Sequence, residues 1–158
     1  PGTDRPDLER MKGRCLAVMG QTIEAHRVFD QLTRANPNDA SLWIEYGAIA
    51  WEGRDFHRVA QCGSRAIALD PMRFEGYLFQ GLFEREAGRS EQAAAFFREA
   101  ASRTESVLPL LLLGRTLEKE GEIERAREIY QRAVSLDPES KEAGQLLGAL
   151  VAVETVHE

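Results

Sequence analysis

Three histidines and two cysteines are the side chains that could support nucleophilic or metal chemistry. A catalytic cysteine needs a histidine within hydrogen-bond reach of its sulfur, and a zinc site needs ligands that are closely paired along the chain. His26, His57 and His157 lie in separate contexts, and Cys15 and Cys62 lie far apart in segments with helical patterning. We therefore expect surface histidines and packed, reduced thiols. The sequence predicts no catalytic residue, no metal site and no cofactor.

A charged run, Glu118-Lys-Glu-Gly-Glu-Ile-Glu-Arg-Ala-Arg127, could hold a metal ion or a charged partner. Its acidic and basic residues recur at three- and four-residue spacing, which is typical of a solvated helix face with ion pairs. No glycine-rich phosphate loop follows a strand, because the sequence predicts no strand. We therefore expect that the chain is not an enzyme.

The most apolar stretch is VLPLLLLGRT, from Val107 to Thr116. A membrane-spanning helix needs about 20 apolar residues, so this run is too short to cross a bilayer. The 158-residue chain is 43% hydrophobic and 29% charged, a composition typical of a folded globular domain. The leucines are thus expected either in a core or on a surface that binds another molecule.

The charge balance argues against a nucleic-acid partner. The formal net charge is −6, and residues 80–158 carry ten basic and fifteen acidic side chains, whereas binding to phosphates needs a concentrated basic face. Reduced thiols and the lack of a signal-peptide pattern favour a cytoplasmic location. Because the sequence opens on Pro1, we expect it to be a segment of a longer protein.

Internal repeats organise the whole sequence. Three similar phrases end in proline: Leu32-Thr-Arg-Ala-Asn-Pro37, Ala66-Ile-Ala-Leu-Asp-Pro71 and Ala133-Val-Ser-Leu-Asp-Pro138. The first two prolines are 34 residues apart, and the third follows after 67 residues, two units less one residue. Aligning the prolines also aligns glycines, a column of small residues and a column of mostly aromatic residues: Gly13, Gly47, Gly81 and Gly114; Ala25, Val59, Ala93 and Ala126; Phe29, Gly63, Phe97 and Tyr130.

Each unit is predicted to be a helical hairpin. Both halves carry apolar residues at three- and four-residue spacing. A glycine between the halves, as at Gly88 and Gly121, suits a helix C-terminus with positive φ, and in the second unit Gly53 lies one place early. The Asp-Pro pair at Pro71 ends the second helix, because the residue before proline resists helical geometry. The small residues let the two helices approach closely.

These columns resemble the tetratricopeptide repeat family. The fourth unit matches its pattern best, with the third and second following: Leu113-Gly114, Leu117, Ala126, Tyr130, Ala133 and Pro138; Tyr77, Gly81, Gly88, Ala93, Phe97 and Ala100; Trp43, Gly47, Ala66 and Pro71. The resemblance implies an all-α, right-handed superhelical solenoid of helix-turn-helix repeats, with about four repeats plus a C-terminal helix.

The aligned columns also predict boundaries. They are a lead-in at 1–5, repeats at 6–39, 40–73, 74–106 and 107–140, and a C-terminal segment at 141–158. The third unit is one residue short and has Glu105 where the others have proline. Leu147-Gly148 begins a fifth unit, so the last segment is either a capping helix or a truncated repeat, with Leu150 and Val151 on its exposed side.

The family's groove-facing positions predict a partner-binding surface on the concave side, with an apolar middle. Applied to this sequence, they are Arg10, Arg14, Ile44, Ala48, Trp51, Leu78, Leu82, Arg85, Leu108, Leu111 and Arg115. The alternative is that superhelix curvature buries Leu78 and Leu111 between adjacent repeats. Glu45 and Glu75 stand where some family members bind a terminal carboxylate, so a carboxylate-binding site is not expected.

The resemblance therefore implies a protein–protein interaction scaffold whose concave groove binds a partly apolar peptide or helix of a partner protein. One alternative is a non-catalytic, substrate-presenting or regulatory arm of a larger enzyme, such as a glycosyltransferase or a hydroxylase. Another is a self-assembly module that forms a homo-oligomer through its C-terminal helix, around Leu146, Leu150 and Val151.

Overall fold

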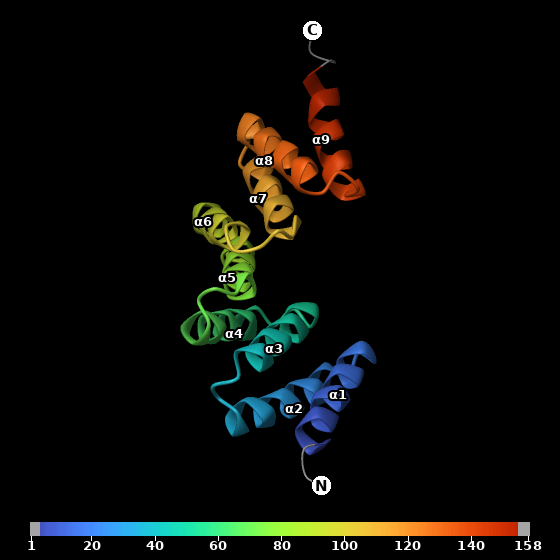
Figure 1. The fold of residues 1–158 in the computed structure, drawn as a ribbon, viewed down its shortest axis with the longest axis vertical. Helices are drawn as coiled ribbons and strands as arrows, with labels where there is room; N and C mark the ends of the chain where they lie inside the picture. The colour runs from blue at the N-terminus through green and yellow to red at the C-terminus, as the bar shows by residue number, and fades with distance from the viewer. Residues whose placement is uncertain (1–3, 155–158) are drawn as a thin grey trace.

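The computed structural model describes residues 4–154, and side chains from residue 6 to residue 152. His157 lies outside this range. The described residues form nine helices and no strand (Figure 1): α1 Asp4–Val18, α2 Thr22–Ala35, α3 Ala40–Glu52, α4 Phe56–Leu69, α5 Phe74–Glu86, α6 Ser90–Ala101, α7 Leu108–Lys119, α8 Ile123–Leu136 and α9 Lys141–Glu154. The first helix begins at Asp4, within the lead-in predicted at 1–5.

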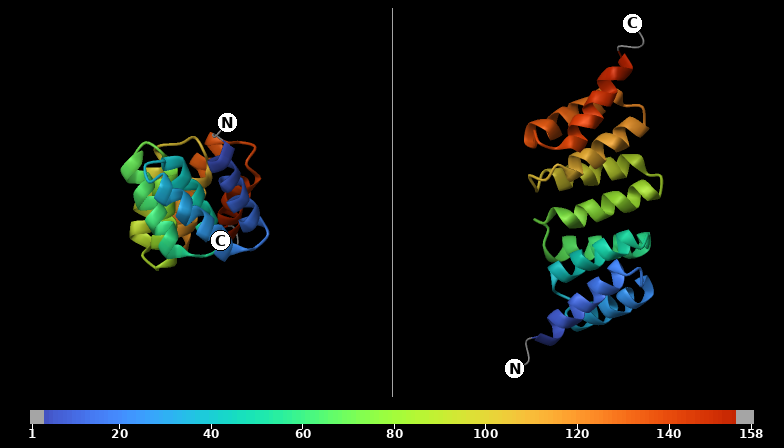
Figure 2. Two further views of the ribbon diagram at one scale, coloured as in Figure 1. Left: turned by 90° about the horizontal axis from the view of Figure 1, so that it is seen from below. Right: turned by 90° about the vertical axis from the view of Figure 1, so that its right-hand side faces the viewer.

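The helices form an elongated stack in which each helix packs on the next one along the chain. Figure 2 shows them as successive layers along the long axis, with the two termini at opposite ends. The predicted all-α solenoid is therefore confirmed. None of the helices within residues 4–154 is long and apolar enough to span a membrane.

Three of the four hairpin turns contain a glycine in the left-handed region, at Gly20, Gly88 and Gly121, with φ of 76° to 79°. In the second hairpin Gly53 lies one place early, as the sequence indicates, and has a φ of −77°. The left-handed residue there is Arg54, with a φ of 57°. A residue with a Cβ is disfavoured in this region, so this turn carries backbone strain that the other three avoid.

The glycine column places an aromatic ring against the first helix. A Cβ on Gly13 would lie 2.6 Å from the ring of Phe29, and one on Gly81 would lie 2.5 Å from that of Phe97. The Tyr130 ring covers Gly114 in the same way. Each ring comes from the second helix of the same hairpin, so the glycine is what allows the two helices to close.

The second hairpin differs, because Gly63 stands where the other repeats have an aromatic residue. The ring over Gly47 is that of Phe79, which belongs to α5 in the next repeat. A Cβ on Gly63 would lie 3.0 Å from the carbonyl oxygen of Gly76, and one on Gly76 would lie 3.1 Å from the backbone nitrogen of Ile67. These two glycines let α4 and α5 approach almost backbone to backbone.

The leucine-rich run serves mainly as core. Leu110 and Leu113 are buried as predicted, and Pro109 lies in the first turn of α7, where its missing N–H disrupts no helical hydrogen bond. The Leu108 backbone N–H donates to Ser106 Oγ at 3.3 Å at the start of this helix, whose N-cap residue is Val107. The expected exposure of Leu150 is wrong, because Leu150 is buried against the main core cluster, whereas Val151 is exposed.

Candidate functional site

The apolar middle of the predicted groove is buried. Leu78, Leu82 and Leu111 expose only 7%, 5% and 3% of their surface, so their predicted exposure is wrong. All three belong to the core cluster that runs from α3 to α9, and Ile44 packs partly against it. Leu78 and Leu82 lie on α5 and Leu111 lies on α7, and each of these first helices packs on the second helix of the preceding repeat, α4 and α6. Leu78 and Leu111 are therefore buried, as the alternative expected.

The basic residues predicted at the two ends of the groove are paired with carboxylates. Arg10 Nε lies 2.9 Å from one carboxylate oxygen of Glu45, and Arg14 Nε lies 3.2 Å from the other. At the opposite end, Arg115 Nη2 lies 2.7 Å from Glu142. Leu108 and Ala48 are exposed but isolated from one another on different helices. These positions do not form a continuous apolar strip.

Two of the predicted groove residues, Trp51 and Arg85, do come together. The Arg85 guanidinium lies 5.8 Å from the centroid of the Trp51 ring, and the Phe56 ring meets Trp51 edge-on at 5.7 Å. These side chains line a cleft of about 440 Å³ between the C-terminal ends of α3 and α5 and the start of α4. Both residues expose only part of their surface, and the rings of Trp51 and Phe56 form the aromatic part of the cleft.

A second cleft, of about 590 Å³, adjoins the first and shares Arg54, Phe56 and Glu86 with it. It adds His57 and Phe83, whose rings lie 6.3 Å apart. We call the combined surface the aromatic cleft; it comprises Trp51, Arg54, Phe56, His57, Phe83, Arg85 and Glu86. Arg54 stacks over Phe56 at 5.5 Å.

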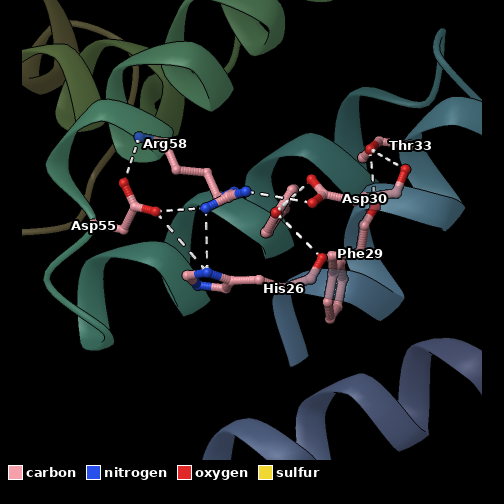
Figure 3. A network of polar contacts seen from close by, with 7 residues as sticks. His26, Phe29, Asp30, Thr33, Asp55 and Arg58 are labelled. Carbon is pink, nitrogen blue, oxygen red and sulfur yellow. Dashed lines mark hydrogen bonds and ion pairs between the residues drawn. The ribbon is translucent and has the colours of Figure 1, made fainter. Parts of the chain in front are cut away.

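A polar network behind the aromatic cleft joins α2, α3 and α4 (Figure 3). Arg58 bridges two carboxylates, with Nη1 at 2.5 Å from Asp55 and Nη2 at 3.3 Å from Asp30. The Tyr46 hydroxyl donates to Asp30 at 2.7 Å. Burial, together with this hydrogen bond, raises the pKa of Tyr46 above its usual value. One guanidinium therefore contacts a carboxylate from each of the first two repeats, and this network links those repeats.

His26 lies within this network, where a surface histidine was expected, and that expectation is wrong. Its Nδ1 is 3.3 Å from Arg58 Nη1. Because a guanidinium can only donate, Nδ1 accepts and the imidazole is neutral. Burial lowers the pKa of His26, and the Arg58 charge lowers it further. His57 is exposed, as expected.

The two cysteines have opposite environments. Cys62 is buried, and burial raises the pKa of its thiol to about 12, which makes it a poor nucleophile. Cys15 is exposed on α1, so the expectation of a packed thiol is wrong there. Within the described residues, no group of three or more His, Cys, Asp or Glu side chains could hold a metal ion.

Sequence reasoning missed Arg54, Phe56, His57 and Phe83. A signal was present in the turn Gly53-Arg-Asp-Phe-His57, because the other three turns have glycine where this turn has Arg54. The aromatic residues were not recognised because they come from different helices, and only the stacking of α3, α4 and α5 brings them together.

Comparisons with known proteins agree with the geometry. Models of the tetratricopeptide repeat match residues 10–58 and 60–106, and a second such model matches residues 84–150. No curated protein matches the sequence.

Several solved structures share the fold at low sequence identity. The protein pilF of Pseudomonas aeruginosa is 18% identical with a TM-score of 0.81, covering 98% of this chain and 72% of that one. MamA from Desulfovibrio magneticus RS-1 is 22% identical with a TM-score of 0.78, covering 99% and 89%. YrrB, described as a TPR protein with an unusual peptide-binding site, is 13% identical with a TM-score of 0.67, covering 90% and 74%.

Proposed function

The chain belongs to the tetratricopeptide repeat family, and from this premise we propose that it binds a partly apolar segment of a partner protein at the aromatic cleft. The family fold is typical of protein–protein interaction scaffolds, which are generally non-catalytic. The cleft lies where the first helices α3 and α5 end.

The observation that carries this proposal is the pairing of partly exposed aromatic rings with arginines at one place. Tryptophan, other aromatic residues and arginine are the side chains most enriched at the energetic centres of interfaces. Here Trp51 and Phe56 form an edge-on pair, and an arginine stacks on each ring. A rigid apolar wall of this kind can bind a partner's side chain with little loss of conformational entropy.

The polar groups around the cleft indicate what the partner segment presents. Glu86 lies 3.6 Å from Arg85, which leaves that charge pair largely balanced. Arg54 makes no ion pair within residues 6–152 and lies exposed beside Phe56. A segment with one apolar or aromatic anchor next to a carboxylate would place the anchor against Phe56 and Trp51, and the carboxylate at Arg54.

A displayed library of random peptides, selected on the purified chain, tests the proposal. We expect selected peptides to carry an apolar anchor near an acidic residue, and Trp51→Ala to weaken their binding by about tenfold or more. Trp51 also packs against the core, so Arg54→Gly provides the second variant. It removes the cation at a left-handed position that glycine favours, and it should weaken binding without loss of folding.

Met72→Ala serves as the control, because Met72 is an exposed apolar residue in the α4–α5 turn, outside the cleft. It should bind the selected peptides as the unmodified chain does. Peptides whose binding is unaffected by both Trp51→Ala and Arg54→Gly would show that the cleft is not the binding site.

A further inference from the structure

The first helix exposes an apolar face that its counterparts bury. Leu8 and Met11 of α1 expose 61% and 54% of their surface, and Met19 in the turn after α1 exposes 68%. A mainly apolar cleft of about 360 Å³ is lined by Met11, Arg14, Cys15, Val18 and Met19. The repeat alignment places Leu8 and Cys15 at the positions of Leu42 and Ile49 in α3. Those two are buried in a cluster with side chains of α2, the second helix of the preceding repeat. In α1 the same face is not covered by any helix within the described residues 4–154.

The last helix also exposes a face that its counterparts bury. Gly148 in α9 aligns with the glycines that lie beneath aromatic rings in the four hairpins. A Cβ built on Gly148, or on Gly144 one turn earlier, would meet no atom within 4 Å. Val151 continues the same face and is 46% exposed. The opposite face of α9 is covered, since Ala143 and Leu150 are buried against the core.

We propose that these two faces bind each other between two copies of the chain, so that α1 of one copy packs on α9 of another. The two faces are complementary in shape, because α1 carries large side chains and α9 carries glycines. Met11 and Leu8 project from α1, and Gly144 and Gly148 leave space on α9 for such groups to enter. Inside three of the four hairpins, a large side chain of the second helix likewise fills the space over a glycine of the first. The intermolecular contact therefore continues the packing of the stack.

Charge also favours this pairing over contact between two like ends. Residues 1–20 carry four basic and three acidic side chains, whereas residues 137–158 carry one basic and five acidic ones. Two C-terminal ends would repel each other, and an N-terminal end would attract a C-terminal one.

The two faces lie at opposite ends of the stack (Figures 1 and 2). A contact between them is heterologous, because the two copies use different surfaces. The assembly then keeps one unpaired face at each of its ends. Chains would add head to tail. One helix pair buries less area than a standard stable interface, so association should be weak and should increase steadily with concentration.

Two single substitutions and their mixture test the arrangement by sedimentation equilibrium and light scattering, from about 1 μM to about 1 mM protein. Met11→Glu places a charge on the exposed face of α1, and Gly148→Leu fills the space on α9. Both sites are open, so both variants should fold, as circular dichroism would verify. We expect the unmodified chain to gain mass with concentration and each variant alone to stay monomeric.

The equimolar mixture of the two variants is the decisive sample. The Met11→Glu chain keeps an intact α9 face and the Gly148→Leu chain keeps an intact α1 face, so one contact can form between them and no second. We expect dimers and nothing larger. Met72→Glu, which changes an exposed methionine away from both ends, should associate as the unmodified chain does.

Three results would overturn the proposal. An unmodified chain that stays monomeric throughout would show that neither face accepts a second copy. Association of Met11→Glu alone at the unmodified level would show a contact between two α9 faces or through the concave side. A monomeric mixture, with an unmodified chain that associates, would show that the two faces do not meet.

Discussion

Gly114 in α7 and Gly148 in α9 hold the same position in neighbouring repeats, yet their surroundings are opposite. The Tyr130 ring lies directly over Gly114, whereas a Cβ on Gly148 would meet nothing within 4 Å. In a helix interior glycine is less favourable than alanine by about 0.5–1 kcal/mol. The comparison teaches that the packing of a second helix makes glycine necessary at Gly114, and that Gly148 has no such role in the single chain.

Removing the ring that covers Gly114 should have the largest effect. Tyr130 is fully buried, and its hydroxyl lies 3.0 Å from Glu118. Tyr130→Ala should lower the free energy of unfolding by about 3–5 kcal/mol, the usual range for a buried aromatic residue. Urea denaturation followed by circular dichroism measures this. A loss below 1 kcal/mol would mean that the hairpin does not depend on the ring.

Adding a methyl group beneath the ring should have the next largest effect. In Gly114→Ala the gain in helix propensity is outweighed by the overlap with Tyr130, and overpacking of this kind costs about 1–3 kcal/mol. We expect a net loss of about 1–2 kcal/mol in the same denaturation experiment. An increase in stability would show that α7 and α8 can move apart freely.

The same substitution at the open position should have the opposite sign. Gly148→Ala adds a methyl group into empty space, so only the helix propensity changes, and α9 should gain about 0.5–1 kcal/mol. Because this gain is local to the last helix, amide hydrogen exchange in residues 141–154 is the measurement. Faster exchange after the substitution would contradict an open face.

A substitution at Arg54 should have a smaller effect on stability, because it changes mainly the backbone conformational preference. Its left-handed φ of 57° is the geometry that glycine adopts in the other three turns. Arg54→Gly should raise the free energy of unfolding by about 0.5 kcal/mol, since relief of strain exceeds the added entropy of the unfolded chain. The mirror variant, Gly88→Ala, should be destabilised. If Arg54→Gly and Gly88→Ala changed the free energy of unfolding equally and in the same direction, the left-handed backbone conformation would not be the cause.

The polar network around His26 joins helices without a glycine contact. Its pH-dependent contribution to the free energy of unfolding should be the smallest of these effects. The pKa of His26 is lowered in the folded chain below its ordinary value of 6.5. The unfolded chain therefore binds the extra proton first, so this contribution to stability is complete above pH 6.5 and is lost as the pH falls below it. Relative to His26→Gln, the unmodified chain should lose stability on acidification from pH 7.5 to about 5. A difference that is independent of pH would contradict the lowered pKa.

The sequence was sufficient to predict the all-α solenoid, because the repeats impose one pattern four times. The aligned glycines, the aromatic column and the Asp-Pro endings each indicate a hairpin, and errors in one unit are corrected by the others. The close approach at Gly13, Gly81 and Gly114 follows from side-chain size alone. At Gly47 the aromatic partner could not be found in the same repeat, because Phe79 reaches it from the next one.

The binding surface could be predicted only in part. Trp51 and Arg85 were predicted as groove residues, and they lie together at the aromatic cleft. Leu78, Leu82 and Leu111 were predicted to be exposed, but they are buried. Cys15 and His26 were misplaced for the same reason. Whether a helix face is covered depends on the neighbouring repeat, and the spacing of residues within one helix carries no information about that neighbour.

By itself, the sequence determined the helices, their pairing into hairpins and the order of the stack, because these depend on periodicity and side-chain size over short distances. The tertiary structure alone decided which apolar residues are buried, since each first helix after α1 packs on the second helix of the repeat before it. It also brought Arg54, Phe56 and Trp51 into one cleft and left the faces of Met11 and Gly148 uncovered at the two ends. These outcomes depend on contacts between different repeats, whose relative orientation is set by packing over the whole array.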